Sequence, residues 1–205
     1  MEREDWNRRW RERSSHFHCD DDPSGVMVAE LGSLVPGRAL DLACGAGRGA
    51  IWLAERGWQV TGVDFSKVGL DKARQLANAR GVQAEWILAD LLDYRPEPQA
   101  FGLVIVFYLQ LPGAQRPAIL KAAAGAVAPG GTFLLVAHDS SNLTEGHGGP
   151  QDAAVLYTAH DVSQDLNEAG LRVERAERVQ RPVQTAEGER IALDALFRAS
   201  RSQVQ

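Results

Sequence analysis

The segment Phe101–Phe107 constrains the fold more than any other part of the chain. Its sequence is FGLVIVF, which is almost wholly apolar over seven positions. Side chains alternate between the two faces of a strand, so an apolar run of this kind is typical of a strand covered on both faces. The segment therefore predicts a central strand of a parallel sheet with helices packed on both faces.

Segments typical of strands and of helices alternate before and after this one. The expected strands are 38–43, 58–63, 83–89, 101–107 and 132–137, and the expected helices are 25–34, 48–56, 66–80, 117–127 and 158–169. Ser66 is placed to cap a helix, and Gly57 and Gly81 are placed to end one. Strands that alternate with helices predict an α/β fold.

The last part of the chain has a different pattern. Segments 171–181 and 189–199 alternate apolar and polar residues and are separated by VQTAEG, which predicts a terminal antiparallel pair. The polar segment 139–157 predicts a long loop, and long loops in compact domains are often functional. The first residues predict a charged helix that carries Trp6 and Trp10 on one face, because they are four positions apart.

Composition limits the classes of protein to which the chain can belong. The start MEREDWNRRWRERSS is too charged for a signal peptide, and no run of 18 apolar residues predicts a membrane span. Two cysteines, Cys19 and Cys44, give no disulfide framework and are typical of a reducing cytoplasm. The net charge of −5 disfavours a general nucleic-acid binder. We therefore expect a cytoplasmic protein, a monomer or homodimer, without a nucleic-acid or membrane partner.

The turn after the first expected strand is the main candidate for a ligand site. Residues 40–50 have the sequence LDLACGAGRGA. Gly45 permits a tight turn, Gly47 lets a ligand approach the backbone, and the helix that follows offers unpaired N–H groups. Loops of this type also bind NAD and FAD, and Gly45-x-Gly47-x-x-Ala50 satisfies the dinucleotide pattern.

Three acidic residues narrow the choice of ligand. Asp41 lies inside the first strand, while Asp64 and Asp90 end the second and third strands. The carboxyl ends of parallel strands form the edge at which open α/β sheets bind ligands. There Asp64 can accept both ribose hydroxyls, and Asp90 can accept an adenine amino group with Leu91 against the ring. Dinucleotide sites do not require an acid at Asp41, whereas a cationic ligand benefits from one.

These motifs resemble a known family. LDLACGAGRG, VTGVDFS, ILADLLDY, FGLVIVFYLQLP and APGGTFLLVAHD resemble class I S-adenosylmethionine (SAM)-dependent methyltransferases over about residues 5–200. The chain is most similar to small bacterial members, such as tellurite-resistance and thiopurine methyltransferases. The resemblance implies a Rossmann-like, mostly parallel seven-stranded sheet with a C-terminal antiparallel hairpin. It also implies one domain over 1–205, with a helical cap at 1–35 and a core at 38–200.

The resemblance implies SAM as the cofactor, S-adenosyl-L-homocysteine as the product, and a role for individual residues. The methionyl end would be bound by Asp41, Ala43, Cys44, Gly45 and Gly47. The ribose would be bound by Asp64, Phe65 and Ser66, and the adenine by Asp90 and Leu91. Beside the methionyl group and the substrate would lie Phe107 and Tyr108. Trp10 would close over the cofactor from the N-terminal helix. We expect Cys44 to pack or to give backbone contacts and not to act as a nucleophile.

Two residues are candidates for catalysis, and one cluster is a candidate for metal binding. His138 follows the fifth expected strand, where it is a general base, a residue that lines the acceptor pocket, or a strand-end residue bonded to backbone. Tyr108 either orients the acceptor or packs on the cofactor. His16, His18, Cys19 and the acidic residues 20–22 are too compressed for a structural zinc site, so we expect a polar lid and no metal.

The predicted function is methyl transfer to a small molecule, with a thiol, a metalloid or a small aromatic O or N atom as acceptor. The sequence FYLQLP after the fourth strand lacks the Asn/Asp-Pro-Pro-Tyr/Phe motif, which disfavours methylation of DNA base amino groups. One alternative is a nicotinamide-dependent oxidoreductase, against which Asp41 and the lack of a recognisable Tyr-x-x-x-Lys pair argue. Another is a SAM-binding protein without catalysis.

Overall fold

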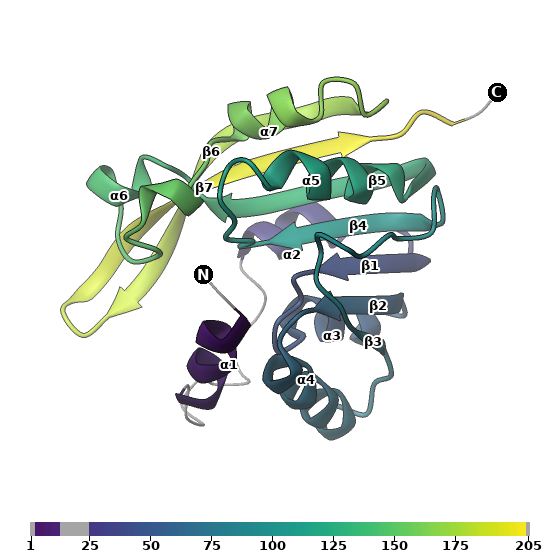
Figure 1. Cartoon of the computed structure of the whole chain (residues 1–205), viewed down its shortest axis with the longest axis horizontal. Helices are drawn as coiled ribbons and strands as arrows, with labels where there is room; N and C mark the ends of the chain where they lie inside the picture. The colour runs from purple at the N-terminus through teal and green to yellow at the C-terminus, as the bar shows by residue number, and fades with distance from the viewer. Residues whose placement is uncertain (1–2, 13–24, 204–205) are drawn as a thin grey trace. The chain divides into compact units, whose positions relative to one another are not determined.

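The computed structural model describes residues 3–12 and 25–203. Their strands form a seven-stranded sheet in the order β3-β2-β1-β4-β5-β7-β6 (Figure 1). The predicted fold class is confirmed, because the sheet is mostly parallel and its C-terminal strands are antiparallel. The chain divides into two compact units, Met1–Arg95 and Pro96–Gln205.

Within its described residues, the first unit holds three parallel strands and four helices. Its elements are α1 (Arg3–Glu12), α2 (Gly25–Leu31), β1 (Arg38–Leu42), α3 (Arg48–Glu55), β2 (Gln59–Asp64), α4 (Lys67–Ala79) and β3 (Glu85–Leu88). Strand β2 pairs with β1 on one side and with β3 on the other. Helices α3 and α4 pack against these strands, and α1 packs against α4.

Local sequence signals determine where these helices begin and end. The Ser66 hydroxyl accepts a hydrogen bond from the Gly69 amide at 3.1 Å, so the predicted cap of α4 is confirmed. Gly57 and Gly81 have φ angles of 84° and 67° after α3 and α4, which is the left-handed conformation that favours glycine. Their positions confirm the two helix ends expected from the sequence.

The second unit holds four strands, three helices and a 3-10 turn among its described residues. These elements are β4 (Phe101–Phe107), α5 (Arg116–Gly125), β5 (Val127–His138), α6 (Asn142–Glu145), η1 (Ala153–Val155), α7 (Ala159–Asp165), β6 (Arg172–Thr185) and β7 (Gly188–Ser200). Strand β5 pairs in parallel with β4 and antiparallel with β7, and β7 pairs antiparallel with β6. The predicted bounds of β4 are confirmed, and Leu103, Val104, Ile105 and Val106 are fully buried.

Two elements are longer than expected. Strand β5 begins at Val127, because its pairing with β4 shifts: Phe101 faces Val127 and Leu103 faces Thr132. The extra residues of this irregularity include Gly130, whose φ angle is 77°. The C-terminal hairpin continues to Thr185 and Gly188, beyond the apolar alternation that predicted it. None of the helices in the described ranges is long and apolar enough to cross a membrane.

Candidate functional site

The loop between β1 and α3 has the tight backbone that the sequence predicts. Ala43, Gly45 and Gly47 have φ angles of 60°, 55° and 78°, and the Gly47 amide donates to the Cys44 carbonyl at 2.8 Å. Ala43 pays the larger steric cost because it has a Cβ, and such strain is held where surrounding structure determines it. The backbone of this loop is therefore held in one conformation at the end of β1.

Packing inside the protein explains why glycine stands at position 47. A Cβ on Gly47 would lie 2.5 Å from Cη2 of Trp86 and 2.9 Å from the Cβ of Ala73. Trp86 also packs against Gly62, where a Cβ would lie 2.8 Å from the indole. Glycine is therefore required at position 47 by packing against β3 and α4, in addition to any approach of a ligand. A cofactor role for Gly47 stays a prediction.

Asp64 holds the loop from the end of β2. Its Oδ2 accepts from the Gly45 amide at 2.8 Å, and its Oδ1 accepts from the Ser66 amide at 2.7 Å. Burial raises the pKa of Asp64 above its ordinary value, although these two hydrogen bonds lower it. Each carboxylate oxygen has a further lone pair, so the group can still accept ligand hydroxyls. The ribose role of Asp64 stays a prediction, and its hydrogen bond with Gly45 is a second role that the sequence did not indicate.

Asp41 is a buried carboxyl group in the same unit, with 3% of its surface exposed. Burial raises its pKa from 3.8 to about 8, the charge of Asp64 raises it further, and a hydrogen bond from the Ala50 backbone together with the charge of Arg48 lowers it. A carboxyl group with this pKa is mostly protonated at pH 7. A cationic ligand next to it would favour ionisation, so Asp41 fits an ammonium or sulfonium group.

Cys44 lies near these acids and is half-buried. Burial and the charges of Asp41 and Asp64 raise the pKa of its thiol well above the ordinary value. The nucleophilic form of cysteine is the thiolate, which this environment disfavours. The geometry therefore supports the expected packing role.

Helix α1 lies directly on the loop. The indole of Trp10 contacts Gly45 so closely that a Cβ there would lie 2.6 Å from Cζ2 of the ring. The Ser66 hydroxyl donates to the buried Asn7 side chain at 2.8 Å, and Lys72 donates to the Trp10 carbonyl. The role of Trp10 as a cover of the cofactor stays a prediction. Asn7 was missed, because a lone asparagine in a charged helix gives no signal of burial.

The predicted adenine residues follow β3. Asp90 Oδ1 accepts from the Leu92 amide at 3.0 Å, and Asp90 Oδ2 lies 4.0 Å from Arg3 of α1. Asp90 and Leu91 are both partly exposed, so they remain open to a ligand. The first unit therefore brings Asp41, Gly45, Asp64 and Trp10 together, and α1 reaches from them to Asp90.

A second polar cluster lies in the other unit, around Asp194 of β7. Asp194 is fully buried. Its Oδ2 accepts from the Tyr108 hydroxyl at 2.9 Å and from Arg181 Nε at 2.6 Å, and a second nitrogen of Arg181 lies 3.3 Å from Oδ1. His138 Nδ1 lies 3.5 Å from the same Oδ1. Tyr108 and His138 were candidates from sequence, and this cluster adds Arg181 and Asp194.

Backbone geometry brings these side chains together. His138 and Asp194 face each other directly in the register of β5 and β7. Tyr108 has a φ angle of 53°, an unusual conformation for a bulky residue, and its amide donates to the Val136 carbonyl at 2.7 Å. Its ring lies 4.8 Å from the His138 ring, measured between centroids. Asp194 gave one signal in the sequence, a charge inside the apolar run IALDALF.

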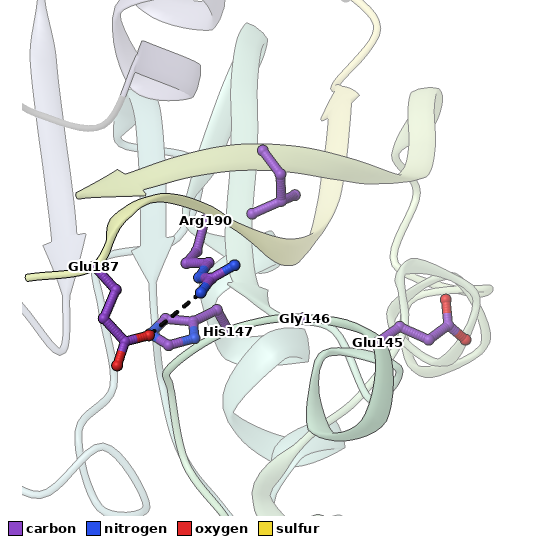
Figure 2. A pocket seen from close by; sticks show the side chains of 6 residues that line it. Glu145, Gly146, His147, Glu187 and Arg190 are labelled. Carbon is purple, nitrogen blue, oxygen red and sulfur yellow. Dashed lines mark hydrogen bonds and ion pairs between the residues drawn. The ribbon is translucent and has the colours of Figure 1, made fainter. Parts of the chain in front are cut away.

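A surface hollow lies at the tip of the β6–β7 hairpin (Figure 2). Its lining residues are Glu145, Gly146, His147, Glu187, Arg190 and Ile191. Glu187 pairs with Arg190 at 3.3 Å, and Glu145 pairs with Arg178 at 2.9 Å. Both acids of the hollow are paired with arginines, so neither is left unpaired for a charged ligand.

Several expectations concern parts that these contacts do not test. Phe107, the last residue of β4, is partly exposed, and its place beside the methionyl group stays a prediction, as do the cofactor roles of Phe65 and Ser66. The candidate metal cluster of His16, His18, Cys19 and residues 20–22 lies outside the described residues. Within 3–12 and 25–203, no group of three or more His, Cys, Asp or Glu residues could hold a metal ion.

Several known proteins similar to this chain are methyltransferases. The chain is 27% identical over 131 residues to 2-heptyl-1-hydroxyquinolin-4(1H)-one methyltransferase of Mycobacteroides abscessus, covering 62% of this chain and 57% of that protein. It is 33% identical over 81 residues to ribosomal RNA small subunit methyltransferase C of Alcanivorax borkumensis, covering 38% of this chain and 25% of that protein. The chain thus spans between a quarter and three fifths of these two curated relatives.

A solved structure has the same fold over most of the chain. It was described for the conversion of a disulfide bond into a thioacetal group during echinomycin biosynthesis, and it is similar with a TM-score of 0.70 at 26% identity. The match covers 89% of this chain and 83% of that one. Residues 39–131 match the family described as methyltransferase domain, a range that includes the loop, Asp64 and Asp90. In this segment and in its fold, the chain is similar to the class I SAM-dependent methyltransferases.

Proposed function

We propose that this protein transfers a methyl group from SAM to a small-molecule acceptor. The observation that carries the proposal is Asp41, a buried carboxyl group with a pKa of about 8 beside the Gly45 loop. A buried acid without a cation is costly, and ionisation becomes favourable when a positive group lies close to it. SAM has an ammonium and a sulfonium, which makes it a suitable partner for this carboxyl group.

In this proposal, different residues of the first unit bind different parts of the cofactor. The methionyl end is held by Asp41, Ala43, Cys44, Gly45 and Gly47. The ribose is held by Asp64, Phe65 and Ser66, and the adenine by Asp90 and Leu91. Trp10 covers the loop and excludes water from it. For Phe107, a residue of the second unit, we keep the role that the resemblance implies. Bound SAM supplies an activated methyl group, so the protein has to position the acceptor and keep the site dry.

The acceptor is proposed to be a small molecule with an O, S or N atom, in agreement with one relative named for a hydroxyquinolinone. The resemblance to tellurite-resistance and thiopurine methyltransferases extends this range to thiols and metalloids. Nucleic acid is disfavoured by the net charge of −5, although one relative is named for ribosomal RNA. His138 is proposed as the base for acceptors that must lose a proton, and Tyr108 as the residue that orients them.

Titration calorimetry with SAM and S-adenosylhomocysteine tests the cofactor site. We expect binding to the unmodified protein and strong loss in Asp64→Ala. A matched control is Asp71→Asn, which changes an exposed acid of α4 that pairs with Lys67. Equal binding by Asp64→Ala and the control would contradict the site, and stabilisation by NAD(H) without SAM binding would favour the oxidoreductase alternative.

Mass spectrometry of acceptors incubated with SAM tests the reaction. The panel contains 2-heptyl-1-hydroxyquinolin-4(1H)-one, an aromatic thiol, thiocyanate and a ribosomal RNA fragment. A mass gain of one methyl group on a small acceptor is the expected result. Methylation of the RNA alone would contradict the proposed acceptor class, and SAM binding with no product would favour the non-catalytic alternative.

A further inference from the structure

Asp194, the buried acid at the centre of the second cluster, has the side chains of Arg181, Tyr108 and His138 around it. It lies on β7, between antiparallel neighbours, and its Oδ2 accepts hydrogen bonds from Arg181 and Tyr108. A partly buried Arg–Asp pair forms without a histidine elsewhere in the unit, where Arg116 and Asp165 lie 2.5 Å apart. His138 nevertheless directs Nδ1 at Oδ1, the oxygen that makes weaker contacts.

The environment of His138 distinguishes its two ring nitrogens. Nδ1 is buried and makes no hydrogen bond among the described residues, and Asp194 Oδ1 lies 3.5 Å from it. Gly149 covers this side of the ring, because a Cβ there would lie 3.0 Å from Nδ1 and 3.2 Å from Cε1. The side chain of His138 keeps 14% exposure. The open edge of the ring is therefore the edge away from Asp194, which carries Nε2.

The charge state of Asp194 decides which nitrogen carries the proton. Burial opposes ionisation, but the nearby His138 and the donors of Arg181 and Tyr108 outweigh it, so the pKa of Asp194 lies below its ordinary value. An ionised carboxylate accepts hydrogen bonds and cannot donate one. Nδ1 facing it must then carry the proton, which leaves Nε2 with its lone pair free. The distance of 3.5 Å is long for a hydrogen bond, and such contacts often shorten when a catalytic complex forms.

We infer that Asp194 is a positioning residue that holds His138 as the Nδ1–H tautomer and so makes Nε2 the proton acceptor for a hydroxylated acceptor molecule. This inference rests on the proposed methyl transfer for its catalytic meaning. In the reaction, the acceptor hydroxyl gives its proton to Nε2 of His138, and the acceptor oxygen forms a bond to the methyl carbon. The carbon–sulfur bond breaks with its electron pair left on sulfur, and the proton leaves Nε2 for solvent.

The substitution Asp194→Asn makes the inference testable without removing volume from the core. Arg181 Nε and the Tyr108 hydroxyl both donate to the Oδ2 position, so the amide oxygen of asparagine belongs there. The amide nitrogen then faces Nδ1 of His138 as a donor, which requires a bare Nδ1 and a protonated Nε2. The variant should therefore hold the wrong tautomer for catalysis, because Nε2 is no longer free to accept a proton.

The tautomer can be observed by long-range ¹H–¹⁵N NMR on protein labelled in its histidines, at a pH where His138 is neutral. The chain has five histidines, and the signals of His138 are those lost in His138→Gln. We expect a protonated Nδ1 in the unmodified protein, a protonated Nε2 in Asp194→Asn, and no change in the matched control Asp165→Asn. A bare Nδ1 in the unmodified protein, or the same tautomer in Asp194→Asn as in the unmodified protein, would overturn the inference.

Binding and turnover separate this inference from the proposed function. Failure of the unmodified protein to bind SAM would refute the proposed function, while the tautomer experiment would still decide the role of Asp194. With 2-heptyl-1-hydroxyquinolin-4(1H)-one as acceptor, Asp194→Asn should lower kcat by about 10²-fold to 10⁴-fold with little change in the KM for SAM. Thiocyanate has no proton to lose, so turnover with it should be retained. Equal losses with both acceptors would show a structural role and contradict the inference.

Discussion

Replacing Asp41 with asparagine should stabilise the protein without its ligand, and the gain should depend on pH. The carboxyl group of Asp41 has its pKa raised from 3.8 to about 8, mainly by burial. The folded protein therefore holds a proton that the unfolded chain releases above about pH 4. Because the folded state binds more protons, stability falls as pH rises from about 4 to about 8, and it changes little above that. Asparagine is neutral at every pH and avoids this loss.

The size of the effect follows from the shift of the pKa. A shift of about four units corresponds to about 5 to 6 kcal/mol above pH 8, which is an upper limit because a buried site relaxes and admits water. A gain of at least about 2 kcal/mol at pH 8.5 is expected, or roughly 4 to 8 °C in Tm for a chain of this length. The asparagine side-chain oxygen can still accept from the Ala50 backbone, so that hydrogen bond is kept.

Thermal unfolding followed by circular dichroism at pH 5, 7 and 8.5 measures the effect. The gain in Tm of Asp41→Asn over the unmodified protein should increase with pH. Asp71→Asn is the control, since Lys67 lowers the pKa of that exposed acid and no gain at high pH is expected. A variant less stable than the unmodified protein at pH 8.5, or a gain independent of pH, would refute the argument from burial.

Three further predictions concern the same unit. Binding of SAM at pH 7 should release about 0.9 proton as Asp41 ionises, so the binding enthalpy should follow the ionisation enthalpy of the buffer; an enthalpy independent of buffer would contradict this. Gly47→Ala should lower the free energy of unfolding by about 1 to 3 kcal/mol in urea titrations, because the new Cβ meets Trp86 at positive φ; a neutral result would show that the indole moves freely. Trp10→Ala should weaken SAM binding in calorimetry by at least a few-fold, as the indole packs on Gly45; unchanged affinity would contradict its role as a cover.

Sequence patterns predicted the parts of the fold that depend on neighbouring residues. The bounds of β4 follow from its apolar run, and the start of α4 follows from the Ser66 cap. The loop at Gly45 and the acids at Asp41 and Asp64 were also found in this way, because each marks the end of an element or a break in its pattern. The irregular start of β5 was missed, since a shift in pairing depends on the partner strand and leaves no periodic signal.

The parts of the candidate sites that were missed depend on distant segments. Asp194 and Arg181 join His138 only through the register of β5, β7 and β6, which pattern analysis does not provide. Asn7 is buried because α1 packs on α4, and its helix is otherwise charged. The need for glycine at position 47 comes from Trp86, a residue of another strand.

The position of β7 also sets a condition on how the protein is made. This strand is the last in sequence among the described residues, yet it pairs between β5 and β6, so the second unit closes around a segment that leaves the ribosome late. Until then β5 and β6 have unpaired edges, which are open to contacts with other chains. Asp194 lies on β7, so it contacts Tyr108, His138 and Arg181 only after β7 has paired. The nascent chain should therefore build its nucleotide loop early and gain its polar cluster only in the final step of folding.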